Sequence, residues 1–483
     1  MAEHADVVVI GAGSAGGAVA ARLSEDPSRT VLLLEAGEDF PDEETAPPSF
    51  VTGGNVIGGW FAGVGAAIPA HDWQYHGEPL AGGRRIRLDR GRLVGGSSMI
   101  NGCIAVRGKP SDFADWEAAG ATGWGWDVVQ PIFARVEDEL SVKRYERPRW
   151  QPFQAAFVDA FVELGFREVA DMNAPDAWDD ATGAWPQNRR NEIRQGSLVT
   201  YVRQARRRAN VQVRGHAHVD RVLVRGGRAT GVRYLDPHGR AHEVEAGRVV
   251  VCAGAYGTPA ILLRSGVGPA EHLGDLGIDV VADLPVGDGL RDHPQTMFEL
   301  ATPPAVAEMA GPGLAVVARG VGWWAFPVAL DERDGVCAVA MALTSQEPQG
   351  TVRLASTDPL EAPVIVHNSQ QVIDRGAFDE AYETFRALVG TRTFSGLGIG
   401  GRDAGRDPAE VLRERLATAR HPACSCAIGR VVDERLGVLG VEGLHVADAS
   451  VFPTNITNNT NLTCFVVGER AAQLVDADDR RSA

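Results

Sequence analysis

A glycine-rich turn near the start of the chain, within DVVVIGAGSAGGAVAARL at residues 6–23, decides the predicted fold. The apolar run before the glycines predicts a buried strand, and residues 15–23 are small and apolar, as in a packed helix. The glycines form the pattern GxGxxG, which between a strand and a helix is typical of dinucleotide binding. Gly11 would permit the tight turn, Gly13 the close approach of a pyrophosphate, and Gly16 the packing of helix against strand.

The second strand of this unit is predicted at Thr30–Leu34, and an acidic residue follows it. Glu35 stands 19 residues after Gly16, close to the spacing at which a carboxylate binds a ribose hydroxyl. The first N–H groups of the helix, at Ser14 and Ala15, would face the phosphates. An acid at this position would repel a 2′-phosphate and disfavours NADP, so FAD and NAD both stay open.

The composition indicates an ordinary globular protein of several domains. The 483 residues are 44% hydrophobic and 23% charged, close to globular averages, which argues against a disordered chain or a coiled coil. The net charge of −16, from 47 basic and 63 acidic residues, makes a nucleic-acid partner a poor candidate, because such surfaces are basic.

The cysteines and the hydropathy pattern indicate the cellular compartment in which the protein is expected. The six cysteines show neither a disulfide-like framework nor a CxxC pair, which favours reduced thiols. The first residues lack the basic and apolar regions of a secretory signal, and the chain has no apolar stretch long enough to span a membrane. We therefore expect a cytoplasmic protein with no membrane span. Cys424 and Cys426, two positions apart, lack a second pair, so no metal site is predicted.

Further elements are predicted along the chain from hydrophobic periodicity. Residues 36–96 predict a long excursion with functional loops, and residues 305–335 predict irregular structure. The other predicted helices and strands are a helix at Pro152–Leu164, strands at Asn210–Arg214, Val219–Arg225, Gly231–Leu235, Arg248–Cys252, Cys337–Leu343 and Thr351–Ala355, and helices at Phe378–Leu388 and Phe465–Val475.

Three segments outside the glycine turn resemble signatures of one family. They are GRLVGGSSMIN at residues 91–101, GAYGTPAILLRSGVGP at residues 254–269 and GVEGLHVADAS at residues 440–450. They are similar to the two signatures and the C-terminal FAD-contacting segment of the glucose-methanol-choline (GMC) oxidoreductases. The resemblance runs from residue 6 to about residue 475 and implies FAD as the cofactor.

The family resemblance also implies an α/β fold with two domains. A discontinuous Rossmann-like FAD-binding domain would comprise residues 1–150, 200–294 and 420–483. A substrate-binding domain built on an antiparallel sheet would comprise residues 151–199 and 295–419.

The first signature suits a flavin ring on physical grounds. Gly95 and Gly96 have no Cβ, so the backbone can pass close to a flat ring, and Ser97 and Asn101 can pair with its polar edge. The position at which some family members link covalently to the flavin through a His is Ile100 here, so FAD is expected to be non-covalent. The predicted cofactor-binding residues are Gly11, Gly13, Ser14, Ala15, Gly16, Glu35, Ala36, Arg92, Val94, Gly95, Gly96, Ser97, Asn101, Gly102, Cys103, Ile104, Val219, Asp448, Ala449 and Thr460.

The catalytic residues are implied by the resemblance. HPACSCAIG at residues 421–429 is similar to the family segment H-P-x-G-T-C-R-M-G, which makes His421 the catalytic base. It departs from that segment at Cys424 and Ala427, which puts the shape of the loop in doubt. The second catalytic residue lies six positions after Pro453, at Asn459.

The neighbouring asparagines at 455, 458 and 461 remain alternatives to Asn459. His293 lies in a family motif and is expected to be structural. A neutral imidazole at His421 can accept a hydroxyl proton, an amide can hold the substrate oxygen, and flavin N5 would accept the hydride.

The expected function is FAD-dependent oxidation of an alcohol group on a small molecule, with oxygen, a quinone or a redox protein as the electron acceptor. Three alternatives stay open: an FAD-containing lyase of the same family (hydroxynitrile-lyase-like), a nicotinamide-dependent reductase, and a flavin-carrying binding or redox-partner protein. The sequence does not separate an oxidase from a dehydrogenase. Shorter bacterial members resemble sugar or aminosugar 6-oxidases and mycofactocin-linked dehydrogenases, and neither is favoured.

Overall fold

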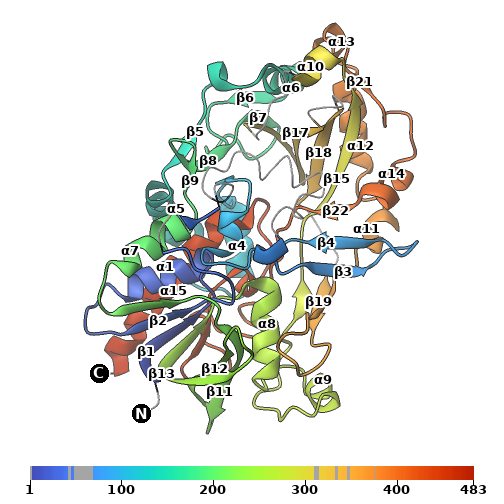
Figure 1. The fold of residues 1–483 in the computed structure, drawn as a ribbon. Helices are drawn as coiled ribbons and strands as arrows, with labels where there is room; N and C mark the ends of the chain where they lie inside the picture. The colour runs from blue at the N-terminus through green and yellow to red at the C-terminus, as the bar shows by residue number, and fades with distance from the viewer. Residues whose placement is uncertain are drawn as a thin grey trace.

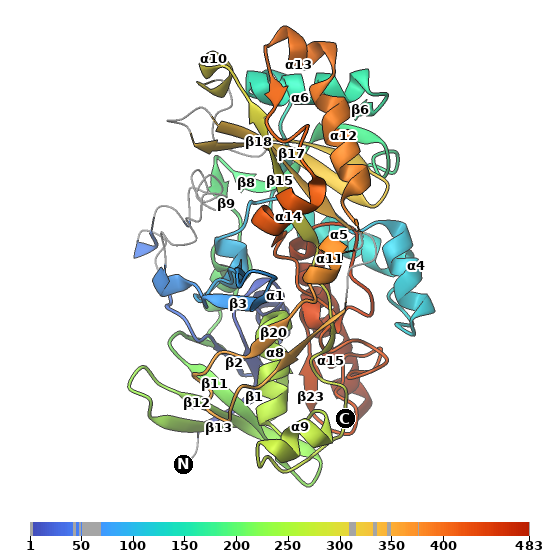
Figure 2. The same ribbon diagram turned by 90° about the vertical axis from the view of Figure 1, so that its right-hand side faces the viewer.

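The protein consists of two parts stacked along its length, with a smaller sheet between them (Figures 1 and 2). The computed structural model describes residues 3–41, 45–47, 50, 69–308, 315–331, 336–344, 349–374 and 376–482. Both ends of the chain lie in the lower part (Figure 1). None of the helices within these ranges is long and apolar enough to cross a membrane.

The lower part is an α/β unit built on a seven-stranded sheet. The central parallel segments at residues 7–10, 31–34 and 249–251 are buried on both faces, as in doubly wound folds, and accordingly consist of Val, Ile and Leu. Six strands pair in the order β10-β2-β1-β13-β12-β11, and β23 pairs in parallel with the end of β13. Strand β12 is antiparallel to both of its neighbours, β13 and β11. The strands are β1 (Glu3–Ile10), β2 (Val31–Leu34), β10 (Val211–Arg214), β11 (His218–Arg225), β12 (Arg228–Leu235), β13 (Ala241–Val251) and β23 (Leu444–Val446).

Helices from distant parts of the chain pack together beside this sheet. Helix α1 (Ser14–Leu23) lies along the C-terminal helix α15 (Thr460–Ser482). They approach closely because Gly468 has no side chain: a Cβ there would stand 2.4 Å from the Ala15 carbonyl oxygen. The other helices of the described chain are α4 (Pro110–Ala118), α5 (Trp126–Glu139), α6 (Pro152–Glu163), α7 (Arg203–Arg206), α8 (Gly254–Arg264), α9 (Ala270–Asp275), α10 (Pro304–Glu308), α11 (Gln370–Asp374), α12 (Asp379–Val389), α13 (Arg392–Gly396) and α14 (Pro408–Arg415).

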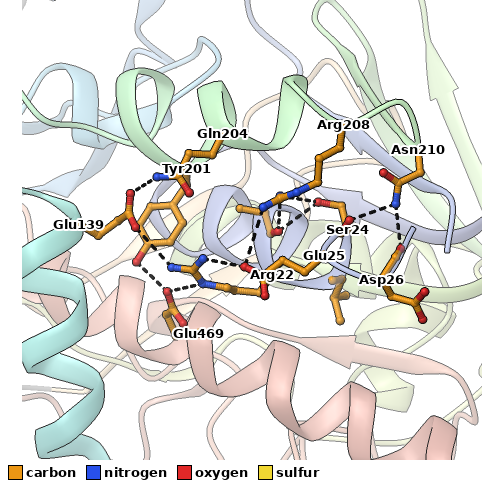
Figure 3. A network of polar contacts seen from close by, with 12 residues as sticks. Arg22, Ser24, Glu25, Asp26, Glu139, Tyr201, Gln204, Arg208, Asn210 and Glu469 are labelled. Atoms are coloured by element: carbon orange, nitrogen blue, oxygen red, sulfur yellow. Dashed lines mark hydrogen bonds and ion pairs between the residues drawn. The ribbon is translucent and has the colours of Figure 1, made fainter. Parts of the chain in front are cut away.

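A buried charge network joins four of these segments (Figure 3). The Glu469 carboxylate on α15 is 2.8 Å from the Arg22 guanidinium on α1 and accepts a hydrogen bond of 2.8 Å from the Tyr201 hydroxyl. Arg135 on α5 lies 3.3 Å from its second oxygen. Glu469 is 2% exposed, so the network replaces lost hydration with ionic hydrogen bonds between segments far apart in sequence.

The upper part is an eight-stranded sheet in the order β21-β15-β18-β17-β16-β7-β6, with β22 also paired to β15. All its pairs are antiparallel except β6 with β7. Its strands are β6 (Arg167–Val169), β7 (Ala181–Ala184), β15 (Pro294–Ala301), β16 (Val316–Gly320), β17 (Trp323–Asp331), β18 (Val336–Leu343), β21 (Gly400–Gly401) and β22 (Ala417–Thr418).

The expectation of irregular structure at residues 305–335 is wrong. Strands β16 and β17 fall within it, and β17 is the partner of β18 along most of its length. Pro327 is tolerated because β16 pairs with β17 only as far as Ala325, so the proline faces no ladder partner on that side. The other predicted helices and strands are confirmed, although β13 begins at Ala241 instead of Arg248 and the last helix extends further at both ends, from Thr460 to Ser482.

A five-stranded sheet lies between the two parts, beside helix α8 (Figure 2). Its order is β14-β19-β20-β3-β4. The strands are β3 (Tyr75–Pro79), β4 (Arg85–Leu88), β14 (Asp288–Leu290), β19 (Gly350–Arg353) and β20 (Val364–Val366), and a further three-stranded sheet contains β5 (Val142–Arg144), β8 (Pro186–Arg190) and β9 (Ile193–Arg194). The five-stranded sheet combines strands from both predicted domains; the domain boundaries stay a prediction.

Candidate active site

A cavity of about 700 Å³ extends from the glycine turn after β1 to the face of the upper sheet formed by β15 and β17. Its volume is within the range of ligand and cofactor sites. Residues from both signatures and from the C-terminal segment line it. The cavity therefore joins the predicted dinucleotide site to the part of the chain predicted to bind substrate.

The three glycines of the turn have three different surroundings. Gly11 has φ +95°, and a Cβ there would stand 2.5 Å from the Cys252 carbonyl oxygen. At Gly16 a Cβ would stand 1.9 Å from the Gly11 carbonyl oxygen, so α1 can approach β1 only without a side chain. A Cβ on Gly13 would meet nothing within 4 Å, which leaves its backbone open to a phosphate from the cavity.

Glu35 lies at the end of β2 and faces the cavity. One carboxylate oxygen accepts the Ala12 N–H at 3.0 Å, and the other accepts the Gly37 N–H at 2.9 Å. Burial raises the pKa of Glu35 to about 7, because a charged carboxylate is poorly solvated there. Each oxygen keeps a lone pair for a further donor, as a ribose hydroxyl would provide.

The glycines of the first signature contact the first glycine turn directly. Gly95 has φ +102° and its N–H donates to the Ala12 carbonyl at 2.9 Å. A Cβ on Gly96 would stand 2.9 Å from the Gly13 Cα. Ile100 lines the cavity and offers only carbon atoms for a link to a flavin, so the expectation of non-covalent FAD stays a prediction.

Most of the predicted cofactor residues lie on the cavity wall. Those that line it are Gly11, Gly13, Ser14, Ala15, Glu35, Ala36, Arg92, Gly96, Ser97, Asn101, Gly102, Ile104, Val219, Asp448, Ala449 and Thr460. Gly16, Val94, Gly95 and Cys103 do not line it. Gly16 and Gly95 belong to the two glycine turns themselves, and Val94 and Cys103 are fully buried.

The residues present fit an FAD molecule. The cavity offers an open glycine backbone, the start of a helix and a carboxylate at the spacing of a ribose contact. Asn461 adds a buried amide: its oxygen accepts the Ser14 hydroxyl at 2.7 Å, and its Nδ2 has no partner in the described chain. Within the same part of the chain, no group of three or more His, Cys, Asp or Glu residues could hold a metal ion.

His421 and Asn459 lie together on the cavity wall, with His421 Nε2 3.0 Å from Asn459 Nδ2. The other ring nitrogen, Nδ1, is 3.0 Å from Nδ1 of His293. The amide nitrogen of Asn459 can only donate, so His421 Nε2 accepts this hydrogen bond and carries the lone pair of the ring. His421 Nδ1 then holds the ring proton and donates it to His293 Nδ1.

Several contacts fix this arrangement. One oxygen of Asp292 accepts the backbone N–H groups of both His293 and His421, each at 2.8 Å. Burial lowers the pKa of His421 well below its usual range, and repulsion from His293, Arg90 and Arg420 adds to the effect. The imidazole is therefore neutral near pH 7.

The loop that carries His421 has a left-handed residue at one of its two departures from the family segment. Cys424 adopts φ +73°, the left-handed region that favours glycine, where the family segment has Gly. The alternative asparagines make other contacts: Asn455 donates to the His421 carbonyl at 3.4 Å, Asn458 donates to the Arg107 carbonyl at 2.9 Å, and the Asn461 amide oxygen accepts the Ser14 hydroxyl.

Sequence reasoning missed part of the site. His293 was expected to be structural, yet its ring contacts His421. Gln295, Trp324 and Phe326 line the cavity next to it. Gln295 could have been found two positions after the histidine motif, whereas the two aromatic residues fall in the stretch expected to be irregular.

The fold and this site define a flavoprotein oxidoreductase with a histidine–asparagine pair beside the cofactor cavity. Residues 5–295 match the model of the N-terminal domain of the GMC oxidoreductases, and residues 346–468 match that of the C-terminal domain. The chain belongs to the GMC oxidoreductase family. It is an FAD-dependent oxidoreductase of alcohols, which decides between the two dinucleotides that the glycine turn left open.

Named relatives cover nearly the whole chain. A GMC-type oxidoreductase of Rhodococcus erythropolis without assigned activity is 32% identical over 99% of both chains. The oxygen-dependent choline dehydrogenase of Sinorhizobium medicae is 33% identical over 97% of this chain and 95% of its own. Among solved structures, pyridoxine 4-oxidase from Mesorbium loti has a TM-score of 0.87 at 24% identity, covering 98% of this chain and 99% of its own. Formate oxidase of Aspergillus oryzae has a TM-score of 0.84 at 22% identity, covering 99% of each chain; both similarities concern the fold.

Proposed function

We propose that this protein oxidises an alcohol group on a small molecule, with His421 as the base that accepts the hydroxyl proton. The observation that carries the proposal is the placement of His421 Nε2 3.0 Å from the Asn459 amide on the cavity wall. Because the Asn459 amide donates to Nε2, that nitrogen carries the lone pair of the ring, which a substrate hydroxyl would meet in place of the amide.

Each residue of the site has one task in this scheme. His421 removes the hydroxyl proton while the carbon-bound hydrogen departs as a hydride. Asn459 donates a hydrogen bond to the substrate oxygen, which holds the alcohol without competing for its proton. FAD, when bound, supplies the hydride acceptor. The low pKa of His421 keeps the base neutral at the start of each cycle.

The proposed partners are a small alcohol and an electron acceptor, which is oxygen, a quinone or a redox protein. Oxygen is supported by the names of relatives, which include oxygen-dependent choline dehydrogenases and a pyridoxine 4-oxidase. Choline and pyridoxine are alcohols that those proteins act on, and they are the first compounds to test here.

Anaerobic titration of the FAD-loaded protein with a panel of primary alcohols tests the proposal. Reaction with a substrate should bleach the flavin absorbance without oxygen, and admitting air or a dye acceptor should restore it. A lyase of the same family would convert its substrate while the flavin stayed oxidised. Flavin that no alcohol in the panel reduces would contradict the proposal.

A further inference from the structure

The cavity wall next to His421 is formed by one face of the upper sheet. Strand register places Gln295 of β15 and Trp324 of β17 opposite Ala342 of β18, one on each side of it. Phe326 follows Trp324 by two residues on the same face, and their rings stack with centroids 5.5 Å apart at 27°. Gln295, Trp324 and Phe326, which we call the substrate wall, all line the cavity.

The substrate wall lies within one small molecule's reach of the catalytic base. The centroid of the Trp324 ring is 6.2 Å from that of His421. Gln295 lies two residues after His293, whose ring contacts His421, and it lines the same cavity as His421. An alcohol held at His421 would therefore place a flat ring near Trp324 and a second polar group near Gln295.

Gln295 has the properties of a ligand-binding residue. Its side chain lines the cavity and the residue is only 4% exposed, yet no group in the described part of the chain hydrogen-bonds to the amide. The amide is open to the cavity, so its oxygen and nitrogen keep their hydrogen-bonding capacity for whatever occupies that space. A bound molecule with a neutral donor or acceptor can use it.

The charges around the substrate wall disfavour a cation. Its three side chains are uncharged, and the nearby guanidinium groups of Arg90 and Arg420 exert the repulsion that His421 already experiences. The carboxylates among the described cavity residues all lie outside this wall; they are Glu35, Asp72, Asp89, Glu361 and Asp448. Neither an ammonium group nor a carboxylate of a substrate would find an ionic partner on the wall itself.

Building on the function proposed above, we infer that the substrate is an uncharged alcohol with a flat apolar ring. The ring packs against Trp324 and Phe326, and a second, neutral polar group on it hydrogen-bonds to Gln295. This substrate class differs from choline, whose quaternary ammonium group is cationic.

A matched set of ring compounds separates the alternatives. The probes are 4-(hydroxymethyl)benzamide, the isosteric anion 4-(hydroxymethyl)benzoate, the cation [4-(hydroxymethyl)phenyl]trimethylammonium, and benzyl alcohol, which lacks the second polar group; choline is added as an acyclic cation. Their analogues with a methyl group in place of the hydroxymethyl group cannot undergo alcohol oxidation. Perturbation of the flavin spectrum by these analogues gives Kd values for the FAD-loaded protein without turnover.

We expect the amide analogue to bind at least tenfold more tightly than the anion or the cation, and the amide alcohol to reduce the flavin fastest under anaerobic conditions. Gln295→Leu should weaken binding of the amide about tenfold and leave the toluene and benzyl alcohol values unchanged, since only the amide contacts residue 295. Gln295→Glu should raise affinity for the cation and lower it for the anion. Thr296→Val, on the opposite face of the same strand, is the control and should change none of these values.

Three results would overturn the inference: tightest binding of a charged probe, choline as the best reductant, or a Gln295→Leu effect of equal size on amide and benzyl alcohol. The binding titrations also keep the two proposals apart. Flavin that no alcohol reduces would count against the proposed function, whereas a wrong order of affinities would count against the substrate class.

Discussion

His293 determines which nitrogen of His421 carries a proton. The two Nδ1 atoms are 3.0 Å apart and one of them must be protonated. Because the Asn459 amide nitrogen can only donate to His421 Nε2, that proton belongs to His421. A catalytic imidazole works only in the tautomer that presents its lone pair to the substrate. His293 is thus a positioning residue that acts through His421.

Removing the acceptor on His293 should slow flavin reduction. His293→Leu leaves the His421 tautomer free, and we expect a loss on the order of 100-fold, as for other misplaced catalytic groups. His293→Gln provides an amide oxygen in its place and should recover most of the rate. Anaerobic stopped-flow with both variants makes the comparison; equal rates for the Leu and Gln variants would show that filling the space is all that His293 does.

Glu35 should couple FAD binding to pH. Its pKa is raised to about 7 in the cofactor-free protein, and the ionised form accepts ribose hydrogen bonds more strongly. Affinity for FAD should therefore increase as the pH rises from about 6 to 8. Glu35→Gln should remove this pH dependence and weaken FAD binding roughly 10- to 100-fold, because hydrogen bonds to a charged group contribute about 1.5–3 kcal/mol.

Titration of apoprotein with FAD, followed by fluorescence quenching at each pH, measures these affinities. The control is Glu38→Gln, which changes a more exposed acid three positions away. If Glu35→Gln binds FAD as tightly as the unaltered protein, the carboxylate does not contact the ribose.

At the scale of single residues, the sequence could supply those that belong to contiguous motifs. The cavity lining by Gly13, Glu35 and His421 follows from local patterns with fixed spacing. Gln295 and Trp324 could not be predicted, because they meet only through the register of β15, β18 and β17. No local pattern indicates that these two residues, 29 positions apart in the sequence, lie on either side of Ala342 in the sheet.

At the scale of elements, two glycines of the turn between β1 and α1 should have different roles. The backbone of Gly13 is open to the ligand, whereas Gly16 lets the helix pack against the strand. Gly13→Ala places its methyl group in open space and should leave the apoprotein as stable as before while weakening FAD binding. Gly16→Ala places the methyl group 1.9 Å from a backbone oxygen and should destabilise the apoprotein itself. Thermal unfolding of both apoproteins, with FAD titration of those that fold, tests the distinction. Equal losses of apoprotein stability would refute it.

Element prediction succeeded where hydrophobic periodicity was clear and failed where it was not. The strand run at residues 7–10 and helix α6 were evident from the sequence. Strands β16 and β17 were missed because the described residues of these strands are buried on both faces, which removes the alternation that marks a half-exposed strand. Their glycines and proline further weakened the signal.

At the scale of the whole molecule, the α/β part depends on contacts between distant segments. Glu469 joins α15 to α1 and to the segment that holds Tyr201 (Figure 3). Through Arg135 it also joins α15 to α5. Glu469→Gln would leave Arg22 and Arg135 without their buried carboxylate, and removing one partner of a buried pair costs about 3–5 kcal/mol. We expect the free energy of unfolding to fall by about 3 kcal/mol in urea denaturation followed by tryptophan fluorescence.

Glu25→Gln is the matched control, because it removes another carboxylate from the same Arg22, at an exposed position. Exposed ion pairs contribute about 0–1 kcal/mol, so this variant should unfold close to the original urea midpoint. Similar losses for the two variants would mean that burial of Glu469 does not strengthen the network. The sequence could not predict this network, since its members are up to 447 positions apart.

The central claim is that His421 accepts the substrate proton, and the rate of anaerobic flavin reduction tests it most directly. With an alcohol that bleaches the flavin, stopped-flow should give a rate about 10²- to 10⁴-fold lower for His421→Ala than for the unaltered protein, the usual cost of removing a general base. FAD should stay bound, and Asn459→Ala should lose less because it removes only a hydrogen bond. The rate of the unaltered protein should fall in acid only well below the usual histidine pKa, because burial lowers that of His421. Reduction of His421→Ala at the original rate would contradict the account.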